Sequence, residues 1–156
     1  MLTFLCPNCW SEVQEDEKIC PKCHSEIEAL RRGSYLDGLV RALRHPWASN
    51  RMWSVFILGE MRDKQAIKPL IDIMDKVWDT KDLWFLREVA IALGKIDGDE
   101  AVSALAHLLD HHSFLIREAA LKALAKVKNK EAWKAVKKAL DDPNPGVRAL
   151  AKEILE

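Results

Sequence analysis

The chain has 156 residues, of which 49% are hydrophobic and 31% are charged, and its 24 basic and 24 acidic side chains cancel. This composition predicts one ordinary folded domain, alone or with a small accessory module, and the neutral net charge gives no general attraction to nucleic acid or membranes. The charge is unevenly placed, because residues 1–30 hold six acidic and two basic side chains, a net −4, which leaves +4 for the rest.

No stretch approaches the roughly 18 consecutive apolar residues that a membrane span requires. The first residues, Met-Leu-Thr-Phe-Leu-Cys, lack the charged beginning and the length of a signal peptide. We therefore expect a cytoplasmic protein without membrane partners. Cysteines stay reduced in that compartment, which favours metal binding over disulfides.

All four cysteines occur in two C-x-x-C pairs near the start of the chain, Cys6 with Cys9 and Cys20 with Cys23. A C-x-x-C turn presents two thiolates on one side of a tight loop, and two such turns can surround a tetrahedral Zn²⁺. The ten residues between the pairs suffice for a short hairpin that brings them together. The spacing predicts a structural zinc site, with a disulfide pair, free thiols or a rubredoxin-type iron site as alternatives, and with His24 as a surface residue.

The segment CPNCWSEVQEDEKICPKCHSEI resembles a short zinc ribbon, and the resemblance covers residues 4–28. Such ribbons usually place glycine directly after each C-x-x-C, where the backbone is left-handed, but this chain has Trp10 and His24 there. Because bulky residues are strained in that conformation, we expect one of the two turns to be distorted. Four thiolates leave no coordination position for water, so the zinc is expected to be structural. The negative charge of this segment also disfavours contact with phosphates.

An internal repeat occupies the chain after residue 33, in which a leucine recurs at spacings of 35, 31 and 31 residues. An arginine precedes the leucine by seven residues in three copies and by six in the second copy: Arg51/Leu58, Arg87/Leu93, Arg117/Leu124 and Arg148/Leu155. A second pattern alternates with the first, as Ala-Ile-Lys-Pro-Leu at 66–70 and related segments at 101–105 and 132–136, with a weaker copy at 35–39. Each repeat is thus predicted to contain an A helix, a short loop and a B helix.

Capping residues support these helices. Ser34 with Asp37 has the pattern of a capping box, and Asn144 precedes a proline at a first helical position. Asp63 and Asn129 each stand three residues before the start of an A-helix pattern. We expect helix starts at all four places.

The B helices end in Leu-Gly-Glu-Met at 58–61, Leu-Gly-Lys-Ile at 93–96 and Leu-Ala-Lys-Val at 124–127. These segments resemble the HEAT-like repeats of the phycobilisome-lyase type, over about three quarters of the chain. The resemblance implies an all-α, right-handed HEAT-type solenoid of about four helix pairs, with the B helices on its concave side. It does not imply bilin attachment, which belongs to a few family members. The predicted domains are a zinc ribbon at 1–28, a linker at 29–33 and a repeat domain at 34–156.

The recurring arginines have two interpretations: they bind loop carbonyls and acids of a neighbouring repeat, or they face a ligand. Two tryptophans, Trp47 and Trp78, fall in A–B loops, where they are either candidate anchors for a partner or side chains that fold back over the ends of the core. Trp53, Trp84 and Trp133 follow apolar helical phases and are expected in the core. The predicted partner surface consists of Trp47, Trp78, Arg51, Arg87, Arg117, Lys122, Lys126 and Arg148.

Catalytic motifs such as a Gly-rich phosphate loop or G-x-S-x-G are absent from the sequence. We therefore expect a protein-interaction or scaffold module that is not an enzyme and that binds an acidic segment of a partner. The alternative is a nucleic-acid-associated protein that uses the lysines at 122, 126, 128, 130, 134, 137 and 138. A third possibility is an enzyme similar to HEAT-like DNA glycosylases, for which Trp78, Asp79, Asp82 and Trp84 would form the cleft.

Overall fold

The computed structural model describes residues 4–14, 16–127 and 129–156. The chain forms two compact units, Met1–Ser54 and Val55–Glu156, which are described separately. Lys128, one of the lysines in the predicted basic run, lies outside the described residues.

The first unit begins with the ribbon. Strand β1 (Phe4–Leu5) pairs antiparallel with β2 (Glu12–Val13), an isolated bridge joins Ile19 to Glu26, and helix α1 spans Ile27–Arg31. In the described part of this segment, the core consists of four buried residues, Cys6, Val13, Cys20 and Ile27. A two-stranded sheet with so small an apolar core is marginal in water, so this segment needs another source of stability.

The first unit continues with α2 (Tyr35–Ala42) and the start of α3 (Ala48–Met61), which ends in the second unit. The predicted capping box at the start of α2 is confirmed, because the Ser34 hydroxyl accepts from the Asp37 N–H and the Asp37 carboxylate accepts from the Ser34 N–H. The domain boundaries 1–28, 29–33 and 34–156 remain predictions, and α1 lies across the first two of these ranges.

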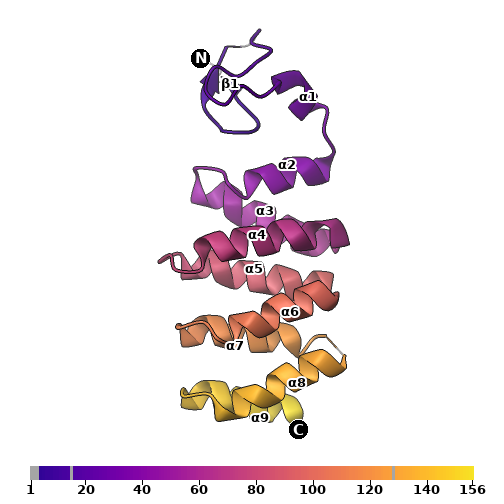
Figure 1. The fold of residues 1–156 in the computed structure, drawn as a ribbon, viewed down its shortest axis with the longest axis vertical. Coiled ribbons are helices and arrows are strands. Elements are labelled where there is room, and N and C mark those ends of the chain that lie inside the picture. The colour runs from indigo at the N-terminus through magenta and orange to yellow at the C-terminus, as the bar shows by residue number, and fades with distance from the viewer. Residues whose placement is uncertain (1–3, 15, 128) are drawn as a thin grey trace. The chain divides into compact units, whose positions relative to one another are not determined.

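The second unit is a stack of helix pairs (Figure 1). After the end of α3, the 3-10 turn η1 (Lys64–Ala66) leads into α4 (Ile67–Val77), which is followed by α5 (Leu83–Ile96), α6 (Asp99–Leu108) and α7 (Phe114–Leu124). Helix α8 (Lys130–Lys138), η2 (Ala139–Asp141) and α9 (Pro145–Leu155) complete the chain. The A helices α4, α6 and α8 contact one another in sequence, as do the B helices α5, α7 and α9, so the unit has two helical layers.

This arrangement confirms the predicted all-α repeat architecture. No strand occurs after residue 33 among the residues that the structure describes. The other predicted caps are also confirmed, since Asp63 accepts from the Gln65 N–H, Asn129 from the Ala132 N–H, and Asn144 from the N–H groups of Gly146 and Val147. In the described part of the chain, no helix is both long enough and apolar enough to cross a membrane.

The core of the second unit runs between the two layers. Leu93 of α5 and Leu124 of α7, two of the recurring leucines, are fully buried. Gly94 lies against α7 so closely that a Cβ placed on it would be 2.7 Å from the Ala123 Cβ. The Leu-Gly pair of the repeat therefore provides one core side chain and one position of close helix contact.

Candidate functional site

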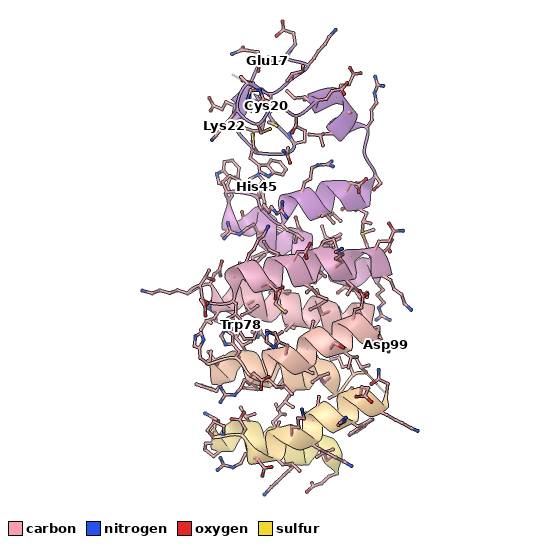
Figure 2. All side chains as sticks on the ribbon, viewed as in Figure 1. Glu17, Cys20, Lys22, His45, Trp78 and Asp99 are labelled. Atoms are coloured by element: carbon pink, nitrogen blue, oxygen red, sulfur yellow. The ribbon has the colours of Figure 1, made fainter. Side chains whose placement is uncertain are left out.

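The four cysteine sulfur atoms lie together in the ribbon. Their Sγ atoms are all within 4.8 Å of one another, with 3.7 Å between Cys6 and Cys23 and 3.6 Å between Cys9 and Cys20. Sulfurs bound at 2.3 Å to one tetrahedral zinc would be about 3.8 Å apart, so these separations fit a single ion. None of the four cysteines forms a disulfide. Figure 2 labels Cys20 beside the sulfur atoms of this cluster.

The two C-x-x-C turns have the same backbone geometry. In each turn the N–H that follows the second cysteine donates to the carbonyl of the first, from Trp10 to Cys6 and from His24 to Cys20, both at 2.9 Å. Trp10 has φ of 61° and His24 has φ of 58°. The expected distortion of one turn is therefore wrong, because both residues adopt the left-handed conformation instead. His24 is exposed and outside the sulfur cluster, as predicted.

Polar neighbours tune the thiols differently. The Ser25 hydroxyl, 3.4 Å from the sulfur, lowers the pKa of Cys23 to about 5, and the Ser11 hydroxyl likewise lowers the pKa of Cys20. Burial instead raises the pKa of Cys6 to about 11. A buried thiol of this kind loses its proton readily only when a cation compensates the thiolate. The cluster thus combines two thiols that favour the charged form with one that needs a bound cation.

The aromatic ring after the first C-x-x-C turn contacts the loop between α2 and α3. Trp10 and His45 have ring centroids 4.3 Å apart, and His45 is only 4% exposed. Burial and then the Arg51 guanidinium lower the pKa of His45, which favours the neutral imidazole. Figure 2 labels His45 in this loop.

Three of the four recurring arginines bind the loop before their own B helix. In each case one guanidinium nitrogen donates to the carbonyls five and six residues earlier. The pairs are Arg51 to His45 and Pro46 at 3.0 and 3.2 Å, Arg117 to His111 and His112 at 2.9 and 3.1 Å, and Arg148 to Asp142 and Pro143 at 2.7 and 3.0 Å. This geometry supports the structural interpretation of these three arginines.

Each of these loops also contains a buried side chain that the sequence analysis missed. The residues six before the arginines are His45, His111 and Asp142, and each accepts a hydrogen bond from the N–H two residues later, at 3.0, 3.0 and 2.8 Å. The Nε2 of His111 lies 3.0 Å from the Trp78 carbonyl, so its N–H can donate there. The fixed spacing to the arginine was the available signal.

The loop of the fourth repeat also binds the third repeat. The Arg117 guanidinium donates to both carboxylate oxygens of Asp142, at 2.7 and 2.9 Å, and both residues are buried. This bond lowers the pKa of Asp142 and raises that of Arg117. Arg117, a predicted partner residue, is thus 8% exposed and occupied within the fold.

The second repeat breaks this pattern. Counting seven residues back from Leu93 leads to Leu86, which is 1% exposed and fills the inner position that arginine takes elsewhere. Arg87, one residue later, points to the surface, where it lies 5.6 Å from the Trp84 ring centroid and pairs with Glu88 at 3.0 Å. The six-residue interval in the sequence therefore places this arginine, unlike the other three, on an open face.

That face contains a groove between α5 and α7, with a volume of about 540 Å³. We call it the α5–α7 groove. Its apolar part consists of Leu83, Trp84, Ile91, Leu115, Ala119 and Ala123, and its charged part of Lys81, Arg87, Glu118, Lys122 and Lys126. Three of the predicted partner residues, Arg87, Lys122 and Lys126, meet here, with four cations against one anion.

The tryptophans differ from the prediction. Trp53, Trp84 and Trp133, which were expected in the core, are 63%, 71% and 39% exposed. Each is next to a buried residue in its helix, and successive side chains of an α-helix differ in direction by about 100°. Hydrophobic periodicity therefore assigned to the core a residue that lies one position away from the buried face. Trp47 is 65% exposed, whereas Trp78 is half-buried and stacks on His107, with ring centroids 4.4 Å apart.

The lysine-rich segment is divided between two places. Lys122 and Lys126 line the α5–α7 groove, whereas Lys134 and Lys138 line a separate hollow that also contains Asp99 and Glu131. The residues suggested for a glycosylase-like cleft are also separated in role, because Trp84 lines the groove, Trp78 stacks on His107 and Asp82 caps α5. The described residues therefore do not gather either set into one site.

Comparison with known proteins agrees with this architecture. A family model for HEAT repeats matches residues 36–113 and 79–156. Among solved structures, the complex of CpcE and CpcF of phycocyanin lyase from Nostoc sp. PCC7120 is similar, with a TM-score of 0.60 and 26% identity over 83% of this chain and 48% of that chain. The fold also matches an engineered protein, with a TM-score of 0.53 and 23% identity over 79% of this chain and 62% of that one.

A search of curated proteins finds no match. This chain spans about half the length of the phycocyanin-lyase chain. The family model nevertheless covers most of the chain, from residue 36 to its last residue, with the helix pairs described above. The chain belongs to the family of HEAT-repeat proteins.

Proposed function

We propose that this chain is a protein-interaction module whose repeats bind a partner and whose ribbon is stabilised by zinc. The observation that carries the proposal is the α5–α7 groove, where Trp84 and Leu115 are 71% and 48% exposed beside four cationic side chains. Large exposed apolar side chains that gather in one hollow are typical of protein interfaces. The exposed Trp47 is a second candidate anchor.

The likeness to a two-protein complex supports this proposal. The similar solved structure is described as the complex of CpcE and CpcF of phycocyanin lyase, so the chain that this fold matches is part of a complex of two proteins. We do not extend its lyase activity to this chain, because this chain spans 48% of that chain at 26% identity. A scaffold without catalysis is the function that we propose.

Zinc is the proposed ligand of Cys6, Cys9, Cys20 and Cys23. The clustered sulfurs fit a tetrahedral ion, and thiolate ligands select zinc or iron over hard cations. We propose a cytoplasmic location, where reducing conditions keep these thiols available. Elemental analysis of purified protein should give one zinc per chain, whereas iron, or oxidised thiols without metal, would refute this assignment.

Nucleic acid is the weaker candidate, because phosphate binding requires cations that act together and the lysine-rich segment is divided. An affinity purification from the source cells, quantified by mass spectrometry, tests the choice. The wild-type chain should enrich a protein partner after nuclease treatment, and Lys122→Glu or Trp47→Ala should reduce its recovery. If nuclease removes everything that is recovered, the nucleic-acid function is correct and the proposed one is wrong.

A further inference from the structure

The α5–α7 groove combines two surfaces that recognise different parts of a ligand. Its apolar side chains come from the same repeat positions on both helices, since Trp84 and Leu115 each precede their recurring leucine by nine residues. Ala119 and Ala123 of α7 are small and lie at the base of the groove, 5% and 4% exposed. A ligand can therefore approach the backbone of α7 closely between two large apolar side chains.

The length of the groove suits a short helix. Its lining runs from Leu83 to Ile91 on α5 and from Leu115 to Ala123 on α7, about 12 Å along each helix at a rise of about 1.5 Å per residue. A helix of two to three turns has the same length. An amphipathic helix that places its apolar face between two host helices is a common mode of peptide recognition.

The charges at the groove select an acidic ligand. Glu118, the one acidic residue in the lining, is already bonded to Lys122, and Arg87 pairs with Glu88. Lys81 and Lys126 have no acidic partner within the described residues. A ligand with carboxylates at its edges would satisfy these cations, whereas a basic ligand would be repelled.

The lining disfavours a single-stranded nucleic acid. Proteins that bind such strands stack successive bases on several aromatic rings along a cationic channel. Here Trp84 is the one aromatic residue of the lining, and the remaining apolar side chains are aliphatic. An aliphatic floor can bury leucine or isoleucine side chains but offers no second stacking surface.

We infer that the α5–α7 groove binds an acidic amphipathic helix of a partner protein, with its apolar face between Trp84 and Leu115 and its carboxylates on Lys81 and Lys126. The inference rests on the proposed interaction function and adds the class of partner and its place of binding. It also assigns the main apolar contact to Trp84, which the sequence predicted to be buried.

The test is a selection of displayed random 16-residue peptides against the immobilised 156-residue chain. Selected peptides should be net negative and have apolar residues at i, i+3 or i+4, and i+7. One selected peptide is then synthesised, and its affinity is measured by NMR titration of the chain, with the Trp84 indole N–H signal as the probe. The loss of this signal in Trp84→Phe assigns it. Trp84→Ala should weaken binding about 30-fold, as expected for a central aromatic contact, and Lys126→Glu should weaken it about tenfold, with less effect at high salt.

Matched controls are Trp133→Ala and Lys137→Glu, which alter exposed residues of α8 outside the groove and should change affinity less than twofold. Enrichment of neutral or basic peptides, or equal effects of groove and control variants, would overturn the inference. Tighter groove-dependent binding of a labelled 15-nucleotide oligo-dT than of any peptide would overturn it in favour of nucleic acid. If the affinity purification with the wild-type chain recovers a protein partner that Trp84→Ala and Lys126→Glu recover equally, only the inference about the groove fails. If the wild-type chain recovers no protein partner in the affinity purification, the proposed interaction function itself fails.

Discussion

The ribbon and the repeats achieve stability by different means. Among its described residues, the ribbon buries Cys6, Val13, Cys20 and Ile27 around four clustered sulfurs, whereas the repeat unit buries apolar side chains along every helix pair. The repeats also bury polar groups, but each of those at the A–B loops is paired within the fold, as Arg117 is with Asp142. The ribbon is therefore proposed to depend on a bound ion, whereas the repeats depend on packing and on paired polar groups.

The sharpest test of this comparison removes one of the proposed metal ligands from the ribbon. Cys20→Ser should abolish zinc binding and unfold residues 4–28, because structural zinc contributes about 10–16 kcal/mol of apparent binding free energy in small domains. The repeat helices should remain, since their core contains no cysteine. Zinc content and backbone amide NMR signals measure the ribbon, and circular dichroism measures the helices. Loss of most helical signal in this variant would contradict the comparison.

The next largest effect is expected at the paired polar groups of the repeats. Arg117→Ala should lower the free energy of unfolding by about 3–5 kcal/mol, because it leaves the buried Asp142 carboxylate without its partner. Arg87→Ala, the matched change in the second repeat, should cost less than about 1 kcal/mol, since its ion pair is exposed. Urea unfolding compares the two variants, and equal losses would show that the repeats do not differ.

A smaller effect should come from the helix contact at Gly94. Gly94→Ala places a Cβ 2.7 Å from the Ala123 Cβ, so we expect a loss of about 1–3 kcal/mol from overpacking. Gly38→Ala in α2 meets no atom within 4 Å and should instead stabilise by up to about 1 kcal/mol through helix propensity. Thermal unfolding of the two variants should therefore shift in opposite directions, and a shift in the same direction would argue against close contact between α5 and α7.

The smallest effect concerns the protonation of His45, the buried residue whose ring contacts Trp10. Because burial and Arg51 lower the pKa of His45, the unfolded chain binds a proton more readily than the folded chain. The contribution of His45 is present above pH 6.5, the ordinary pKa of this group, and is lost as the pH falls below it. His45→Asn keeps an acceptor for the Trp47 N–H but does not titrate. The free energy of unfolding of the wild type minus that of His45→Asn should increase from pH 5.5 to 7.5. The ionisation of the cysteine thiols affects both chains alike and cancels in this difference.

The sequence predicted the cysteine cluster, the helical repeats and four helix caps because each depends on residues close together in the chain. It did not predict the exposure of Trp53, Trp84 and Trp133, since hydrophobic periodicity cannot distinguish the edge of a buried stripe from its centre. It also missed the buried His45, His111 and Asp142. The only sequence signal for them is the fixed spacing of six residues to the recurring arginine, because the position is His in two loops and Asp in the third, and their role depends on loop geometry that hydrophobic periodicity does not report.

The shifted arginine of the second repeat has a consequence for recognition along a repeating surface. Identical repeats would offer a ligand several equivalent positions, each displaced from the next by one helix pair. Leu86 and Arg87 make one position chemically distinct, because only there does the arginine leave the loop and lie beside an exposed tryptophan. A ligand that requires this pair can bind in one register alone. A one-residue change in spacing thus gives the repeating surface one position that differs chemically from all equivalent positions.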